Sequence, residues 1–140
     1  MRNLFFIALV FIACAGCSES KKAVPMKALF DGGEVQFLHK GAATASGYEL
    51  TLMSRYWLDQ KELSPERSNY FQYQLGKKIK LVIGNDTVAP ALFYYIPLIA
   101  ENEKEIDLKF RLEKEQVDQA KKIIIDDSVF NLHKINLAFN

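Results

Sequence analysis

Side chains that commonly carry out catalysis or bind metals are sparse in this sequence of 140 residues. It holds two histidines, His39 and His133, and two cysteines, Cys14 and Cys17. So few imidazoles and thiols leave very little from which to build a metal site. A single histidine beside strand residues is more often a surface or rim residue than a catalytic base. We therefore expect no metal, no cofactor and no catalytic histidine.

Familiar catalytic motifs are also missing from the sequence. It contains no Gly-x-Ser-x-Gly turn for a serine nucleophile and no glycine-rich phosphate loop. Asp126 and Asp127 are the most suggestive carboxylate pair, but adjacent residues on a strand point to opposite faces and do not converge on one atom. We expect this pair to end a strand and turn the chain. The sequence thus predicts a protein that is not an enzyme.

Charge and composition indicate one ordinary folded domain. The chain has 18 Lys and Arg against 17 Asp and Glu, a formal net charge of +1, and 49% of its residues are hydrophobic. A chain this close to neutrality is not built mainly to coat nucleic acid, and its apolar content excludes disorder over the whole length. The mixed charges from Glu101 to Lys122 are typical of a solvated face.

The N-terminus has the organisation of a secretory signal peptide. Arg2 precedes an unbroken apolar run from Leu4 to Ala13, and small residues follow at Ala15 and Gly16. This arrangement is typical of a signal peptide, and the run is shorter than the ~20 residues that a transmembrane helix needs. We expect residues 1–16 to be removed.

The residues around the expected cleavage point carry a more specific signal. Ala15-Gly16-Cys17 resembles the lipobox of bacterial lipoproteins. The resemblance implies cleavage after Gly16 and lipid attachment to Cys17, which would anchor the protein in a membrane. Cys14 stands three residues before Cys17, where the family usually has an aliphatic residue; lipidation at Cys14 instead would place Phe11 there, a poorer fit. Ser18, in place of the Asp that retains such proteins at the inner membrane, implies an outer-membrane location in the cell envelope.

Residues 17–26 have the polar composition of a lipidated tether, and residues 27–140 form the domain. After loss of the signal peptide the chain has equal numbers of basic and acidic residues, so the membrane contact is expected to come from the lipid. The domain holds no cysteine, so it folds without a disulfide. In its general character it resembles the small uncharacterised lipoproteins of Bacteroidetes-type bacteria.

The elements of the domain are predicted from alternating apolar residues. Tyr48–Trp57 and Ile106–Leu112 alternate most strictly, so we expect Leu50, Leu52, Leu108 and Phe110 in the core. Pro90 makes residues 87–96 an edge strand or a bulged one. Further strands are expected at 34–37, 70–75, 79–83, 123–125 and 135–139. We also expect a small-residue loop at 41–47, a helical turn at 64–65 and a solvated helical turn or loop at 113–122.

Seven or eight short strands without a long amphipathic helix predict an all-β fold. At this length we expect an immunoglobulin-like antiparallel β-sandwich. A small lipocalin-like β-barrel is the alternative.

Aromatic residues are the remaining candidates for function. Trp57 shares a strand face with charged residues, and one of the adjacent Tyr94 and Tyr95 must face away from the core. Exposed Trp and Tyr favour partner binding. We expect a non-enzymatic binding or scaffold module with an envelope protein or glycan as partner. A small-ligand carrier or an envelope hydrolase is the alternative, and an open apolar cavity would favour it over a filled core.

Overall fold

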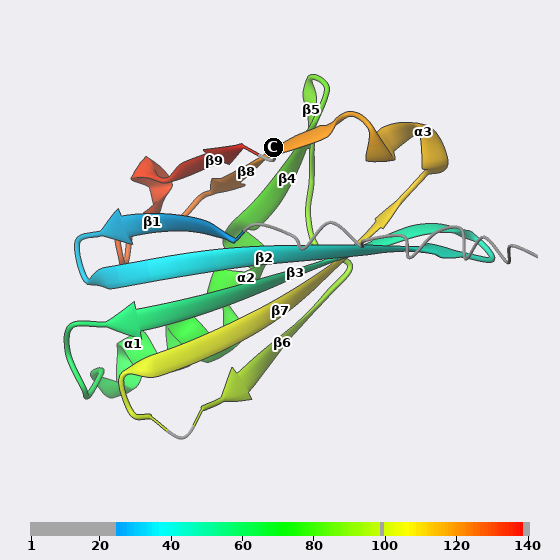
Figure 1. Cartoon of the computed structure of the whole chain (residues 1–140). Helices are drawn as coiled ribbons and strands as arrows, with labels where there is room; N and C mark the ends of the chain where they lie inside the picture. Colours follow the sequence, from blue (N-terminus) through cyan, green and yellow to red (C-terminus); the bar gives the residue numbers. More distant parts are fainter. Residues whose placement is uncertain (1–24, 99, 139–140) are drawn as a thin grey trace, which may run out of the picture.

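A computed structural model of the chain describes residues 25–98 and 100–138 (Figure 1). The predicted signal peptide, Cys17 and most of the predicted tether lie outside these residues. In the described part the chain forms nine β-strands and few helical residues. The strands are β1 (Met26–Phe30), β2 (Gly33–Thr44), β3 (Gly47–Leu58), β4 (Ile79–Ile83), β5 (Asp86–Val88), β6 (Leu92–Pro97), β7 (Glu103–Leu112), β8 (Ala120–Ile125) and β9 (Asn136–Ala138). The helices are α1 (Pro65–Tyr73), α2 (Leu75–Lys78), α3 (Lys114–Val117) and the 3-10 helix η1 (Leu132–Lys134).

The strands form two antiparallel sheets. The five-stranded sheet has the order β1-β2-β3-β7-β6, and the four-stranded sheet has the order β5-β4-β8-β9. In Figure 1 the five-stranded sheet lies in front, and α1, α2 and the four-stranded sheet lie behind or above it. The two sheets are separate in the described residues, so the architecture is a sandwich and not the alternative barrel.

The strand order is that of an immunoglobulin sandwich with one strand added. In that fold strands A, B, E and D form one sheet and C, F and G the other, with C′ beside C in some members. From β2 onward the present order reads A-B-E-D for β2-β3-β7-β6 and C′-C-F-G for β5-β4-β8-β9. The predicted fold class is therefore confirmed, and β1 is an extra strand that pairs with β2 ahead of the common topology.

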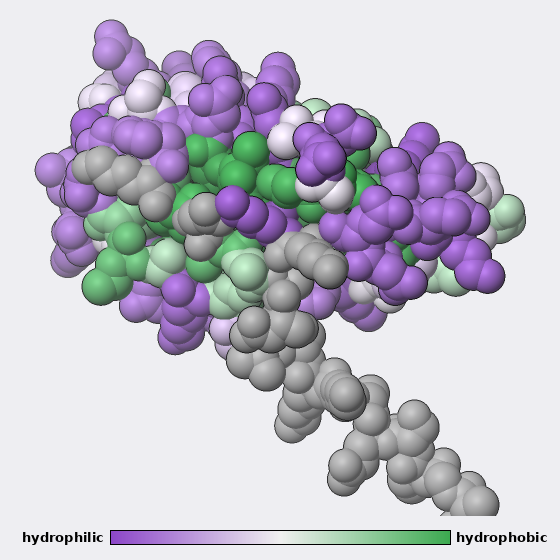
Figure 2. Space-filling model, turned by 90° about the horizontal axis from the view of Figure 1, so that it is seen from above, coloured by the Kyte–Doolittle hydropathy of each residue, from purple (hydrophilic) through white to green (hydrophobic). Residues whose placement is uncertain are grey.

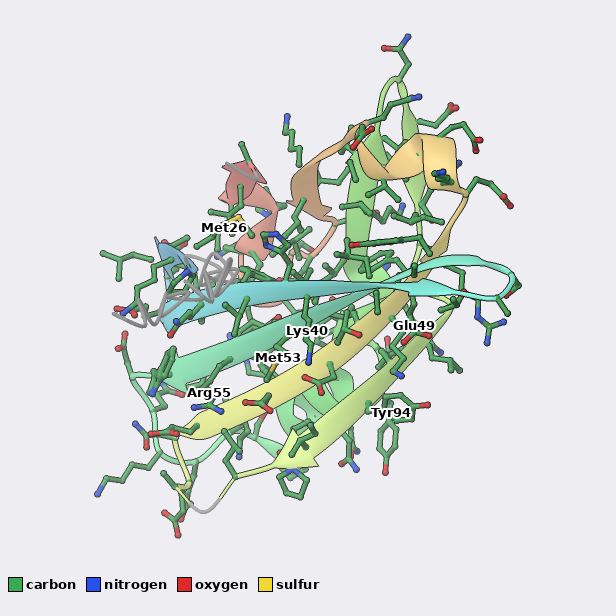
Figure 3. All side chains as sticks on the ribbon, turned by 45° about the vertical axis from the view of Figure 1, so that its right-hand side comes forward. Met26, Lys40, Glu49, Met53, Arg55 and Tyr94 are labelled. Carbon is green, nitrogen blue, oxygen red and sulfur yellow. The ribbon has the colours of Figure 1, made fainter. Side chains whose placement is uncertain are left out.

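Alternate residues of each long strand fill the core. Leu50, Leu52, Leu108 and Phe110 are buried, as predicted. Ile79, Leu81 and Ile83 of β4 and Ile123 and Ile125 of β8 face them from the second sheet. Burial of each such side chain contributes roughly 1.5–3 kcal/mol. At the upper side of the molecule, Met26 packs half-buried against the core (Figure 3), and Figure 2 shows a hydrophobic band between hydrophilic margins on this side.

The prediction of a strand at residues 70–75 is wrong, because this segment is helical. Ser64 caps α1 by accepting a hydrogen bond from the backbone N–H of Arg67 at 3.3 Å, and Pro65 occupies the first turn. Phe71 of α1 and Leu75, the first residue of α2, are both buried. Tyr73, which a strand would place on the same face as both, is 58% exposed.

Two further segments, 41–47 and 87–96, also differ from their predicted structures. Residues 41–47, predicted as a loop, mostly extend the β2–β3 hairpin, whose strands pair from Gly33 with Leu58 to Thr44 with Gly47. Small side chains without a core contact are compatible with this exposed end of the ladder. Residues 87–96 are not one strand: β5 ends before Pro90, and β6 joins the other sheet. The solvated helical turn or loop predicted at 113–122 is confirmed as the short helix α3, which has no buried residues, and β8 begins at Ala120.

Candidate binding face

One face of the five-stranded sheet packs on the core, and no described element covers the other (Figure 3). We term this second surface the open face. It consists of the even-numbered residues 34–40 of β2, the odd-numbered residues 49–57 of β3, the odd-numbered residues 103–111 of β7 and the even-numbered residues 92–96 of β6. Figure 3 looks onto it, with Lys40, Met53, Arg55 and Tyr94 labelled.

The register of the strands places apolar and charged side chains in neighbouring rows. Leu38, Met53, Asp107 and Tyr94 lie side by side across β2, β3, β7 and β6. In an antiparallel sheet such directly opposed residues touch. The next row, toward the end of β3, holds Gln36, Arg55, Glu105 and Ile96. The open face therefore has apolar side chains set among ionic ones.

An ion pair fixes the second of these rows. The Nε and Nη2 atoms of Arg55 lie 2.7 and 2.6 Å from Oε2 of Glu105. The Glu105 side chain is only 7% exposed although it belongs to the open face. A buried carboxylate needs such a charged partner to offset its lost hydration. Lys109 and Glu49 form a second, more exposed pair at 3.1 Å.

Asp107 lies between these two pairs and has no ion-pair partner of its own. Its Oδ1 atom is buried and accepts no hydrogen bond from the described residues. Burial raises the pKa of the Asp107 carboxyl, and the charge of Glu105 raises it further, while Lys109 and Arg55 act in the opposite direction. Asp107 is thus the polar group on this face whose hydration is least well replaced.

The three aromatic residues singled out from the sequence are not brought together. Trp57 is half-buried on the open face opposite Glu103, whereas Tyr94 is 49% exposed and stands opposite Asp107, four residues further along β7. Tyr95 lies on the other face, half-buried, with its ring centroid 6.3 Å from that of Phe71. Tyr95 therefore contributes to packing, and the open face includes only Trp57 and Tyr94.

The ionic rows of the open face were not predicted from the sequence. Alternation marks the side of β3 with Glu49 and Arg55 as polar, but it does not say which strand lies beside β3. The pairing of β3 with β7 brings Arg55 to Glu105, 50 residues away. The available signal was that β3 and β7 both alternate strictly and both carry charges on their polar side.

The Asp126–Asp127 pair shapes a turn, as expected from the sequence. The buried carboxylate of Asp127 accepts hydrogen bonds from the Tyr70 hydroxyl at 2.6 Å and from three backbone N–H groups. These N–H groups belong to Val129, Phe130 and Leu132, at 3.0, 3.1 and 3.2 Å. Burial and the hydrogen bond to Asp127 raise the pKa of the Tyr70 hydroxyl. The carboxylate thus holds the chain between β8 and β9 in place.

The two histidines lie at separate places in the fold. His133 has its backbone N–H and its Nδ1 atom 3.0 and 2.9 Å from the carbonyl oxygen of Asp127, so it belongs to the same turn. His39 lines a pocket of about 140 Å³ together with Tyr48, Leu50, Leu112, Val117 and Ala120. In the residues that the structure describes, no three His, Cys, Asp or Glu side chains gather closely enough to hold a metal ion. No helix there has the length and apolar character needed to cross a bilayer.

Comparison of the chain with protein-family models, with curated proteins and with solved structures found no match.

Proposed function

We propose that this protein is a lipid-anchored, non-enzymatic binding or scaffold module of the bacterial cell envelope, and that it binds an envelope protein through the open face. The proposal joins the resemblance of Ala15-Gly16-Cys17 to a lipobox with the uncovered sheet face of the folded domain. The observation that carries it is this face: a broad sheet surface on which no element of the described residues packs.

The composition of the open face supports a protein partner. Aromatic residues, Met and Arg are enriched at the centres of protein–protein interfaces. Met53 and Arg55 lie at the middle of the face, Trp57 lies near the end of β3, and Tyr94 lies on the edge strand β6 in the same row as Met53. Tyr and Trp carry much of the energy in such contacts because they bury a large area with few rotatable bonds.

The ion pairs of the face also suit binding. Arg55 and Lys109 are already paired with Glu105 and Glu49, so their side chains lose little freedom when a partner docks. Preorganisation of this kind lowers the entropic cost of association. Among the described residues of the face, charges outside these pairs remain at Lys40, Glu103, Asp107 and Arg111, where a partner would supply the opposite charge.

No observation favours the small-ligand carrier over this proposal. Ligand pockets usually measure about 300–1,000 Å³ and are largely apolar, and the apolar pocket beside His39 measures about 140 Å³. Two larger depressions, of about 540 and 470 Å³, are lined mostly by polar residues such as Lys77, Lys80, Glu49 and Arg111. A hydrolase would need convergent polar groups around a reacting atom, and on the open face Arg55 and Lys109 are engaged in ion pairs with Glu105 and Glu49 instead.

The anchor is tested by mass spectrometry of the mature N-terminus. We expect a chain that begins at Cys17 and carries acyl groups, and a Cys17→Ala variant that leaves the outer-membrane fraction. Two or three acyl chains give stable anchoring, so the difference should be nearly complete. A Cys14→Ala variant is the matched control and should stay with the membrane. A mature chain beginning at Met1 would contradict the proposal.

The binding face is tested by capture of partners from gently solubilised membranes. Met53→Lys places a charge at the middle of the open face, and Tyr73→Lys places one on α1, behind the sheet. We expect partners captured by the unaltered protein to be lost with Met53→Lys and kept with Tyr73→Lys, provided that both variants melt near the unaltered protein. Equal recovery with both variants would exclude the open face as the binding surface.

A further inference from the structure

The strand β6 forms one edge of the five-stranded sheet. It pairs with β7 on one side, and no described strand pairs with its other side (Figure 1). In an antiparallel ladder, alternate residues direct their backbone N–H and C=O groups to each side. An edge strand therefore presents a row of backbone groups that can pair with another strand.

Apart from Pro97, the last residue of β6, this edge lacks the usual features that prevent such pairing. Fourteen consecutive residues between Asp86 and Glu101 carry no charge. Proteins commonly protect an edge with lysine, with very short strands or with a covering element. The other edges show these protections: β1 carries Lys27 paired with Glu34 at 3.5 Å, and β5 and β9 are three residues each.

Only one face of β6, the inner one, packs against other described elements. Its inner face is fixed by packing, because the ring of Phe93 lies against Gly76 of α2 and Tyr95 contacts Phe71. On the open face, Leu92 and Tyr94 are 44% and 49% exposed. The strand is thus held rigidly in an extended conformation while one edge and one face stay accessible.

We propose that β6 pairs with β6 of a second copy of this chain, in antiparallel orientation about a two-fold axis at Tyr94. Opposite residues of an antiparallel pair share a face. This register sets Tyr94 against the partner's Tyr94 and Leu92 against the partner's Ile96 on the open face. On the inner face it sets Phe93 against the partner's Tyr95.

Each of these contacts is favourable by chemical type. Aromatic residues meet aromatic ones and aliphatic residues meet aliphatic ones, and such cross-strand pairs each contribute roughly 0.2–1 kcal/mol. No charge faces a like charge. The two five-stranded sheets become one continuous sheet, and their open faces lie on the same side.

The contact is expected to be weak. Six residues from each copy provide less than the ~800 Å² per partner of a standard stable interface. Pairing should therefore be trapped chemically rather than sought by size alone.

The experiment uses the full chain carrying Tyr94→Cys. Cα atoms of directly opposed antiparallel residues are about 4.5–5.5 Å apart, within the range of about 4.4–6.8 Å in which a disulfide forms. We expect mild oxidation to give a covalent dimer about tenfold faster or more than with Leu29→Cys on the opposite edge, because pairing raises the local concentration. Leu29 is 79% exposed and belongs to β1, so random collision would favour the control. The unaltered chain reports dimers formed through Cys14 or Cys17.

The register has its own test. Leu92→Cys and Ile96→Cys should form mixed dimers when combined and far fewer when each is alone, because the proposed axis opposes residue 92 to residue 96. Adding Ile96→Lys to Tyr94→Cys should slow cross-linking by placing a charge on the edge. Equal rates for Tyr94→Cys and Leu29→Cys, or no mixed dimer, would overturn the proposal. The purified protein suffices for these measurements, so their outcome is independent of the anchor and of any envelope partner.

Discussion

The Asp127 carboxylate is the most heavily hydrogen-bonded side chain in the described part of the chain. It replaces its lost hydration with the Tyr70 hydroxyl and three backbone N–H groups. Removing a buried acceptor leaves its donors unsatisfied, at roughly 1–3 kcal/mol for each group. The turn that it organises also places Phe130 and Leu132 in the core.

We predict that Asp127→Ala lowers the free energy of unfolding by about 3 kcal/mol or more. Asp126→Ala is the matched control and should change the free energy of unfolding by less than ~0.5 kcal/mol. The Asp126 side chain is exposed, and its ion pair with Lys80 is long, at 3.9 Å. Urea unfolding followed by tryptophan fluorescence measures both values. Similar losses for the two variants would show that the hydrogen bonds of Asp127 contribute little.

Asp127 stabilises the folded protein, whereas the negative charge of Asp107 destabilises it. The pKa of Asp107 is raised in the folded protein, so the folded state binds more protons than the unfolded state between the two pKa values. The free energy of unfolding then falls as the pH rises from the unfolded pKa of about 3.9 through the folded pKa. The partial exposure of Asp107 keeps this contribution small.

We predict that Asp107→Asn is more stable relative to the unaltered protein at pH 7 than at pH 3.5. The amide cannot ionise, so the variant lacks the loss of stability that the Asp107 charge causes. Asp59→Asn, at an exposed position outside the strands, is the control and should show a smaller change with pH. Thermal melting across this pH range gives the difference, and a constant difference would contradict the prediction.

At the level of single residues, the sequence predicted which apolar side chains of a strand are buried in the core. Leu50, Leu52, Leu108 and Phe110 follow from alternation, which needs no knowledge of the neighbouring strand. The burial of Glu105 and the orphaned Oδ1 of Asp107 depend on which strand lies beside which. That information is non-local, and alternation within one strand does not contain it.

Among the elements, α1 shows that the apolar residues at positions 71, 73 and 75 can be interpreted either as a strand or as part of a helix. Apolar residues at positions 71, 73 and 75 fit a strand by their period of two, but 71 and 75 alone fit a helical turn. The cap at Ser64 and the proline after it were visible in the sequence and were predicted as a single helical turn. The helix instead continues to Tyr73, because Phe71 can insert among Tyr56, Phe130 and Tyr95.

We predict that Phe71→Ala lowers the free energy of unfolding by about 3–5 kcal/mol, as expected for an aromatic residue removed from a close-packed core. Tyr73→Ala should cost less than ~0.5 kcal/mol, because the side chain is exposed. A strand over residues 70–75 would place both side chains on one face and make both changes severe. Chemical denaturation of the two variants distinguishes these cases.

For the whole molecule, the sequence predicted the architecture better than the connections. A fold class needs only the count of strands and the scarcity of amphipathic helices. The assignment of β5 and β6 to different sheets depends on Pro90, where the sequence indicated an irregular strand but not a change of sheet. The extra strand β1 was missed because Met26–Phe30 is short and one of its apolar residues, Leu29, faces solvent.

The absence of cysteine from residues 18–140 gives a prediction for the entire domain. Its stability comes from the packed core between the sheets, without a disulfide. We predict that a reducing agent leaves the melting temperature of the purified protein unchanged. Leu108→Ala, which removes a fully buried side chain, is the positive control and should lower the melting temperature clearly. A fall in melting temperature on reduction would indicate a stabilising disulfide.

The pairing of β3 with β7 has a consequence for how the chain reaches its native state. The hydroxyl of Ser54 donates a hydrogen bond to the carbonyl oxygen of Ile106 at 2.8 Å, across 52 residues of sequence. The β2–β3 hairpin is local and can form in about 1–10 μs, whereas sandwiches dominated by distant pairings fold in about milliseconds to seconds. Association of β7 with this hairpin is therefore the step expected to limit refolding. Substitutions between β3 and β7 should slow refolding. Substitutions near Ala45, at the exposed end of the β2–β3 hairpin, should chiefly alter how often the two strands separate at that end.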